Sequence, residues 1–196
     1  MINTGWLGSG DTSAVLLHQT DGYGLCGFLF YAGYLAKHGV GVVAMDLCGY
    51  GQSFCVGRPL GNDPAGQVKV VTDAVRADGA TRIVLIGASM GGVGEPDGGQ
   101  SRRSRRHRRP VRPTVFERSS VTADAANVTM PALFAFSNTD KSDLDTVRKA
   151  LPNMPSKAKE FLTYDTGHGY ELLRDPSSLE FTPLAERVLG WAKTGS

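Results

Sequence analysis

The chain has 196 residues, 41% of them hydrophobic and 20% charged, which is the size and composition of one globular domain with a sizeable core. No stretch approaches the roughly 20 apolar residues of a membrane span, and the first residues lack the basic and apolar regions of a signal peptide. The net charge of +2 is uneven, because eight of the fourteen arginines lie between positions 102 and 118; removing these eight positive charges leaves −6 for the rest.

The first half of the chain alternates short apolar runs with helical patterns. Gly39 stands where a left-handed helix cap is expected, and Asp63 and Pro64 are an N-cap residue and a first helical residue. The predicted elements are a strand at 14–17, a helix at 28–38, a strand at 40–45, a helix from Asp63-Pro64 and a strand at 83–86.

The same alternation returns in the second half. Ser142 resembles a helix start in which Asp145 completes a capping arrangement, and Pro152 ends that helix. The predicted elements are a strand at 132–136, a helix from 142 to 151, a strand at 160–164 and a C-terminal helix within 175–191 that restarts at Thr182-Pro183.

Strands that alternate with helices predict an α/β fold, a mostly parallel sheet with helices on both faces. In such sheets ligands bind beyond the carboxyl ends of the strands. Polar side chains follow the ends of five predicted strands, at His18, Asp46, Ser89, Asp140 and His168. Their shared location at one sheet edge is stronger evidence for a site than any single motif.

Ser89 lies in Gly87-Ala88-Ser89-Met90-Gly91, a Gly-x-Ser-x-Gly pentapeptide directly after a buried strand. The flanking glycines allow a turn so tight that the backbone of the serine is strained and its hydroxyl stands above the sheet edge, as a nucleophile requires. The alternative is a tight turn whose serine only caps a helix.

A nucleophilic serine needs an imidazole to take its proton and a carboxylate to orient that imidazole. His38 ends a helix and His107 lies among arginines, which leaves His18 and His168. His168 lies in a Gly-His-Gly loop after the last predicted strand and is the better candidate base.

Asp140 follows the strand at 132–136 directly, whereas Asp143 and Asp145 are explained as acids of a first helical turn. The candidate triad is therefore Ser89, Asp140 and His168. Its order along the chain is the order of the α/β-hydrolase triad.

The chain resembles the α/β hydrolases, closest to small bacterial esterases and dienelactone-hydrolase-like proteins. The resemblance covers 13–92 and 121–194, and it rests on the motif at 87–91, on Asp46-Leu47-Cys48-Gly49-Tyr50-Gly51-Gln52-Ser53, on Asp140 and on Gly167-His168. An arginine is more usual in the family where Cys48 stands, and further strands usually precede the one at 14–17.

By this resemblance, the backbone N–H groups of Thr20 and Met90 form the oxyanion hole, with Gln19 where the family usually has glycine. For His18 an orienting hydrogen bond within its loop is favoured over direct catalysis. The candidate pocket residues are His18, Tyr23, Phe28 and Tyr170, with core packing as the alternative for the three aromatic rings.

The pattern breaks after the nucleophile motif, where the family has a crossover helix and a strand. Glycines and Pro96 disfavour a helix at 93–99, and 100–113 has few apolar residues, so an irregular segment is expected at 93–119 and disorder at 94–119. Three explanations stay open: a basic insertion that binds anions, nucleic acid or a membrane surface, a mobile lid, and the preferred one, an out-of-frame stretch. The rest of 1–196 is expected to be a single domain.

The predicted function is that of a serine hydrolase, which cleaves a small ester or similar acyl compound through an acyl-enzyme. No metal or organic cofactor is implied. If the segment after Ser89 is disordered, the turn that carries Ser89 lacks a supporting helix, and catalysis is impaired. The alternatives are a noncatalytic protein that keeps the fold, and an anion or nucleic-acid binder. Arginines without interleaved aromatic residues are weak evidence for specific nucleic-acid recognition.

Three cysteines, Cys26, Cys48 and Cys55, favour free thiols in a reducing cytoplasm because their number is odd and their spacing is not that of metal ligands. One disulfide with one spare thiol is the alternative.

Overall fold

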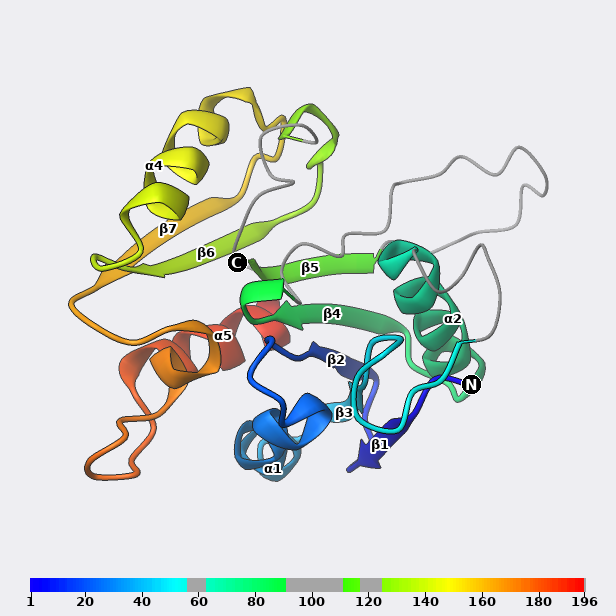
Figure 1. Ribbon diagram of the computed structural model, residues 1–196. Helices are drawn as coiled ribbons and strands as arrows, with labels where there is room; N and C mark the ends of the chain where they lie inside the picture. The colour runs from blue at the N-terminus through cyan, green and yellow to red at the C-terminus, as the bar shows by residue number, and fades with distance from the viewer. Residues whose placement is uncertain (56–62, 91–110, 117–124, 196) are drawn as a thin grey trace.

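The computed structural model describes residues 1–55, 63–90, 111–116 and 125–195. Within these residues the strands form one sheet in the order β1-β3-β2-β4-β5-β6-β7 (Figure 1), with β1 antiparallel and the others parallel to their neighbours. The strands are β1 (Thr4–Leu7), β2 (Thr12–Leu17), β3 (Gly41–Met45), β4 (Arg82–Gly87), β5 (Val111–Phe116), β6 (Ala132–Ser137) and β7 (Lys159–Tyr164).

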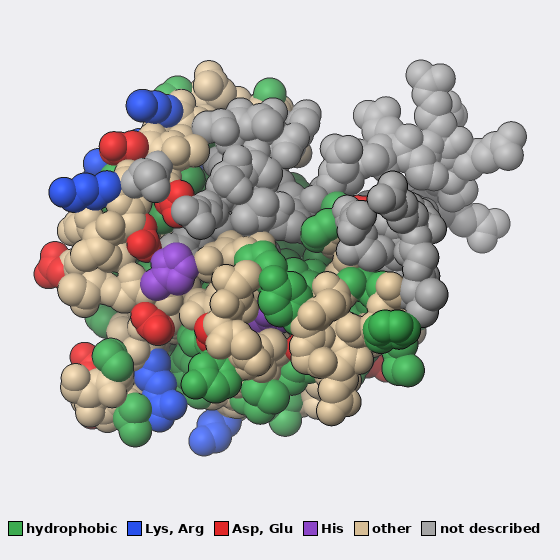
Figure 2. Space-filling view, in the orientation of Figure 1, with side chains coloured by type: hydrophobic (Ala, Val, Ile, Leu, Met, Phe, Trp, Pro, Cys, Tyr) green, Lys and Arg blue, Asp and Glu red, His purple; other side chains and the backbone are tan. Residues whose placement is uncertain are grey.

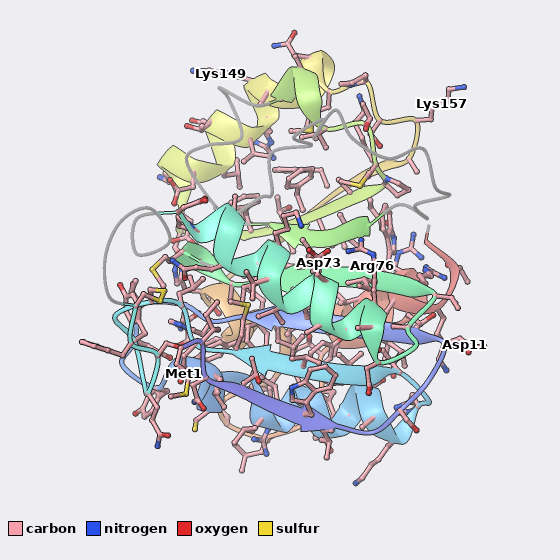
Figure 3. The ribbon with its side chains drawn as sticks, turned by 90° about the vertical axis from the view of Figure 1, so that its right-hand side faces the viewer. Met1, Asp11, Asp73, Arg76, Lys149 and Lys157 are labelled. Carbon is pink, nitrogen blue, oxygen red and sulfur yellow. A yellow bond between two sulfur atoms is a disulfide. The ribbon has the colours of Figure 1, made fainter. Side chains whose placement is uncertain are left out.

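Helices cover both faces of the sheet. Alternate strand residues point to opposite faces, so that Leu16 packs with α1 and α5, whereas Leu17 packs with α2, the helix in front of the sheet in Figure 3. Phe134 and Phe136 of β6 pack with α4. The α-helices are α1 (Leu29–Lys37), α2 (Pro64–Ala77), α4 (Lys141–Ala150) and α5 (Pro183–Thr194), and the 3₁₀-helices are η1 (Gly24–Phe28), η4 (Ala125–Asn127), η5 (Leu151–Asn153) and η6 (Gly169–Leu173).

Each strand and helix that the sequence predicts has a counterpart at nearly the same residues, and the predicted α/β class is confirmed. Gly39 has a positive φ of 79° after α1, and the Asp63 carboxylate accepts a hydrogen bond from the N–H of Gly66 at the start of α2. The expected N-cap at Ser142 is wrong by two residues, because α4 begins at Lys141 with Asp140 as its N-cap. None of the described helices has the length and apolar character needed to cross a bilayer.

The irregular segment expected at 93–119 is corrected in part, because residues 111–116 form β5 between β4 and β6. The register shifts between Leu85 and Ile86, opposite Pro113 and Val115, so the strand passes its proline with a bulge. A proline has no N–H for the ladder, and a bulge accommodates this loss. The disorder expected at 94–119 is likewise wrong for 111–116. Residues 91–110 and 117–124, which include the rest of that segment, the position of the family's crossover helix and most of the predicted lid or out-of-frame stretch, lie outside the described residues.

β1 is an element that the sequence analysis did not find. It adds one antiparallel strand before β2, at the edge of the sheet, with Trp6 and Leu7 about half exposed. Its four residues include a glycine and only two large apolar side chains, too few for a periodic pattern.

The expectation of three free thiols is also wrong, because Cys48 and Cys55 form a disulfide and only Cys26 is a free cysteine. The turn between them brings their Cα atoms within 5.6 Å, a spacing that suits the bond. The alternative of one disulfide with one spare thiol is therefore the correct one, and the cysteines no longer argue for a reducing compartment.

Candidate active site

Ser89 follows β4 directly and has the backbone strain that its motif predicts. Its φ is +49°, a left-handed conformation that costs a residue other than glycine about 1–3 kcal/mol. The preceding N–H, of Ala88, donates to the carbonyl of Leu17 on the neighbouring strand, at 3.0 Å. Ser89 is thus placed at the carboxyl edge of the sheet by the β2-β4 ladder.

Asp140 comes three residues after β6, at the N-cap of α4. An aspartate at this position commonly accepts a hydrogen bond from the first turn of its own helix, but the Asp140 side chain makes no such bond. Its Oδ2 instead lies 3.1 Å from Nδ1 of His168. The carboxylate therefore orients the imidazole, and the positive end of the α4 dipole favours its negative charge.

His168 is held in a loop between β7 and η6. The flanking Gly167 and Gly169 have φ values of +105° and +57°, which glycine adopts without strain. The His168 backbone N–H donates to Oε2 of Glu171, at 3.2 Å. The side chain of His168 is 41% exposed and that of Asp140 22%, so the pair lies at the surface with the ring accessible from outside.

The His168 loop packs on the loops that follow β2 and β4. A Cβ placed on Gly169 would overlap the side-chain oxygen of Gln19 and would lie 3.2 Å from the Cβ of Ala88. The N–H of Tyr170 also donates to Oε1 of Gln19, at 3.3 Å. The residue after His168 is therefore in contact with the residue before Ser89, which brings the three candidate triad positions to one edge of the sheet.

The two candidate oxyanion donors lie on adjacent loops. Thr20 follows β2, Met90 follows β4, and these strands are paired with Leu17 opposite Gly87. Thr20 is exposed, whereas Met90 is half-buried and packs against the α2 side of the core. The pairing brings both loops to the same edge of the sheet as Ser89.

His18 is fully buried and makes the local hydrogen bond that the sequence analysis favoured. Its Nε2 accepts from the N–H of Leu47 at 3.1 Å, so the proton is on Nδ1, which donates to the carbonyl of Gln19 at 2.8 Å. The ring also meets Tyr50 edge-on, with centroids 5.0 Å apart. His18 therefore orients its loop, and it does not line the cavity beside Gly87 and Ala88.

Asp46, another polar residue at a strand end, is buried and holds loops together. Its carboxylate accepts from the side chain of Asn3 at 2.8 Å and from the N–H groups of Leu25 at 2.7 Å and Gln52 at 3.2 Å. Any Cβ at Gly51 would overlap this carboxylate. Three donors satisfy Asp46, which explains how a carboxylate is accommodated in the interior without a catalytic role.

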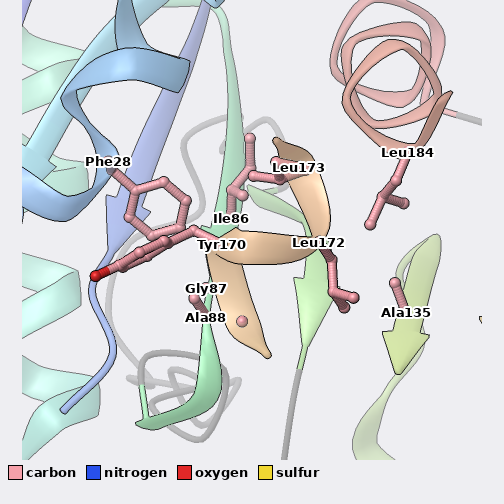
Figure 4. A pocket seen from close by; sticks show the side chains of 10 residues that line it. Phe28, Ile86, Gly87, Ala88, Ala135, Tyr170, Leu172, Leu173 and Leu184 are labelled. Carbon is pink, nitrogen blue, oxygen red and sulfur yellow. The ribbon is translucent and has the colours of Figure 1, made fainter. Parts of the chain in front are cut away.

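The three aromatic residues predicted to line the pocket do not lie together in the structure. Phe28 and Tyr170 meet edge to face, with centroids 5.4 Å apart, and line a cavity of about 20 Å³ beside Gly87 and Ala88 (Figure 4). That volume holds about one water molecule. Tyr23 is 70% exposed and lies outside this cavity, so it is not a core residue. Figure 2 shows a histidine on the molecular surface, with acidic side chains close to it.

Two residues of the site were missed by reasoning from the sequence. The Gln19 side chain joins the β2 loop to the His168 loop across 151 positions, which no spacing could indicate. Glu171 stands three residues after His168, a capping-box spacing that could have been recognised. Among the described residues, no group of three or more His, Cys, Asp and Glu side chains has the arrangement of a metal site.

The sequence matches no known protein family and no curated protein. Solved structures share its fold. A monoacylglycerol lipase of Paleococcus ferrophilus has a TM-score of 0.71 and 14% identity over 100% of both chains. An esterase of Exiguobacterium antarcticum has a TM-score of 0.68 and 15% identity over 98% of this chain and 96% of the other. A dienelactone hydrolase of Anabaena variabilis has a TM-score of 0.70 and 17% identity over 97% and 90%. The chain therefore has the α/β-hydrolase fold that its sequence motifs predict.

Proposed function

We propose that the protein is a serine hydrolase that cleaves small esters or similar acyl compounds. The observation that carries this proposal is the Asp140–His168 hydrogen bond of 3.1 Å, at the same sheet edge as a serine with strained backbone. The likeness to esterases, a lipase and a dienelactone hydrolase supports the same reaction class.

In this mechanism Asp140 holds the proton of His168 on Nδ1, so that Nε2 can accept the proton of the Ser89 hydroxyl. The serine oxygen attacks the acyl carbonyl, and the N–H groups of Thr20 and Met90 stabilise the oxyanion. His168 then passes the proton to the departing alcohol, which leaves an acyl-enzyme on Ser89. A water molecule, activated by the same imidazole, releases the acid. The reaction needs no metal or organic cofactor.

Covalent labelling tests this function directly. A fluorophosphonate probe should label the wild-type protein at Ser89 and should fail to label Ser89→Ala, with peptide mass spectrometry to locate the adduct. Ser53→Ala is a useful comparison, because Ser53 is also buried but bonds its hydroxyl to the Asp46 carbonyl. Labelling equal in wild type and Ser89→Ala, or none in a folded wild type, would argue for a noncatalytic protein with this fold.

A further inference from the structure

An open groove lies on the His168 side of the candidate site. It has a volume of about 270 Å³ and is lined by Tyr23, Gly27, Phe30, Tyr170, Glu171 and Arg174. We call it the aromatic groove. Its residues come from the segment around η1, from the first turn of α1, from η6, which begins directly after His168, and from the residues after η6, which include Arg174 and Pro176.

The groove shares one lining residue, Tyr170, with the cavity at the candidate site. Tyr170 lines the groove and also the cavity beside Gly87 and Ala88. That cavity holds only about one water molecule, so it has no room for a substituent of an ester. A larger substituent on the His168 side does not fit this cavity, and the aromatic groove, which shares Tyr170 with it, has room for one.

The walls of the groove are aromatic rings. Tyr170 meets Phe30 at 72° with centroids 6.3 Å apart, and it lies so close to Gly27 that a Cβ there would be 2.6 Å from its ring. The guanidinium of Arg174 lies 5.5 Å from the centroid of Phe30. Because residue 27 is glycine, no side chain from that position covers the ring of Tyr170. The groove therefore offers the faces and edges of aromatic rings to a ligand.

The charges at the groove are of opposite sign, with Glu171 and Arg174 both in its lining. Glu171 would repel an anionic ligand and Arg174 would repel a cationic one. The groove therefore has no electrostatic potential of one sign that would attract a charged ligand. An uncharged group avoids both costs. The volume of the groove, about 270 Å³, is just below the range of about 300–1,000 Å³ for ligand pockets, which suits a ligand part as small as one ring.

We propose that the aromatic groove binds the aryl group of an uncharged arylalkyl ester. This inference rests on the proposed hydrolase function for its substrate, but the preference of the groove for a ring can be measured without turnover. Aromatic rings prefer edge-to-face or offset contacts with one another, an attraction that a saturated ring of similar size cannot make.

Binding to Ser89→Ala separates the groove from the chemistry. The probes are N-benzylacetamide and N-(cyclohexylmethyl)acetamide, amides that mimic the corresponding acetates, titrated by protein NMR. The benzyl compound should bind about 2- to 10-fold more tightly, the equivalent of one aromatic contact. Tyr23→Ala in the same background should reduce that ratio. The control is Phe54→Ala, because Phe54 is 71% exposed, like Tyr23 at 70%, and does not line the groove.

Turnover gives the second arm. Wild type should hydrolyse benzyl acetate with a higher kcat/KM than cyclohexylmethyl acetate, and Tyr23→Ala should narrow the difference, chiefly through KM. Equal binding of both amides, or a preference unchanged by Tyr23→Ala, would overturn the aryl assignment. Selective binding by Ser89→Ala together with a wild type that cleaves neither ester would support the groove and overturn the hydrolase function.

Discussion

Replacing Gly169 by alanine tests whether the packing of the His168 loop shapes the site. At this position the backbone has φ +57°, and the new methyl group would overlap the side-chain oxygen of Gln19. The left-handed conformation costs a residue with a Cβ about 1–2 kcal/mol. Gln19 must also move away from the N–H of Tyr170, and the lost hydrogen bond costs about 0.5–1.5 kcal/mol.

Gly169→Ala should therefore lower the free energy of unfolding by about 1.5–3.5 kcal/mol. Because the substituted residue follows His168 directly, we also expect turnover of 4-nitrophenyl acetate to fall about 10²-fold, the cost of a misplacement of about 1 Å. Urea unfolding and steady-state kinetics measure the two effects. Gly33→Ala is the matched control, since nothing lies within 4 Å of its Cβ position in α1, and it should stabilise the protein by about 0.5–1 kcal/mol.

The role of Gln19 in this loss can be isolated with a double-mutant cycle. In a Gln19→Ala background the overlap with the new methyl group disappears, and only the backbone strain and the 3.2 Å approach to Ala88 remain. Gly169→Ala should then cost about 1 kcal/mol less than it does in the wild type. If the two substitutions are additive, or if Gly169→Ala resembles Gly33→Ala, the contact between the two loops does not constrain His168.

Asp140→Asn should lower kcat about 10⁴-fold with little change in unfolding, because an amide no longer holds its histidine partner in the productive tautomer. Hydrogen bonds from Arg187 hold the pKa of Glu160 below its ordinary value, so this carboxylate stabilises the fold above about pH 4.3 and loses that contribution as pH falls through the lowered value. Glu160→Gln should therefore lower the free energy of unfolding at pH 7. Measured by urea unfolding at a series of pH values, this free energy should also fall less steeply with acid in the variant than in the wild type. Breaking the bond between Cys48 and Cys55, by Cys48→Ser or with a reductant, should cost about 2–3 kcal/mol, the chain entropy of so short a loop.

Matched variants give each of these predictions a control. Asp145→Asn changes an exposed acid of the same helix as Asp140, and equal kinetic losses in both would remove the orienting role. Glu180→Gln changes an exposed glutamate outside the Glu160–Arg187 pair, and if stability falls with acid in the same way in Glu160→Gln and in Glu180→Gln, the linkage to Glu160 is contradicted. Cys26→Ser removes the exposed free thiol, and reductant should still destabilise that variant.

The sequence predicts the arrangement of the fold well where a buried strand leads directly into a polar residue. Ser89 and Asp140 follow β4 and β6 within a few positions, so the parallel order of the strands alone sets them at one edge. Asp140 is preferred over Asp143 and Asp145 for the same reason, because it lies closer to the end of its strand. The bond between Asp140 and His168 agrees with that choice.

Features that depend on contacts between distant segments could not be read from the chain. The Gln19–Tyr170 hydrogen bond joins residues 151 positions apart, and local patterns carry no information at that range. β5 contains Pro113, whose missing donor disfavours a strand, and the sheet accommodates it only because the ladder shifts register there. The disulfide depends on a turn whose closure no count of cysteines could establish.

The structure also separates the two histidines that the sequence left as candidates. His18 has both ring nitrogens engaged by backbone groups, and a second proton on Nε2 would point at the N–H of Leu47 in a fully buried position. That environment suits an orienting role. His168 has a carboxylate at Nδ1, and its side chain is 41% exposed, so a positive charge formed on the ring is paired and partly solvated. Of these two residues, only His168 has the surroundings that a proton acceptor for Ser89 needs.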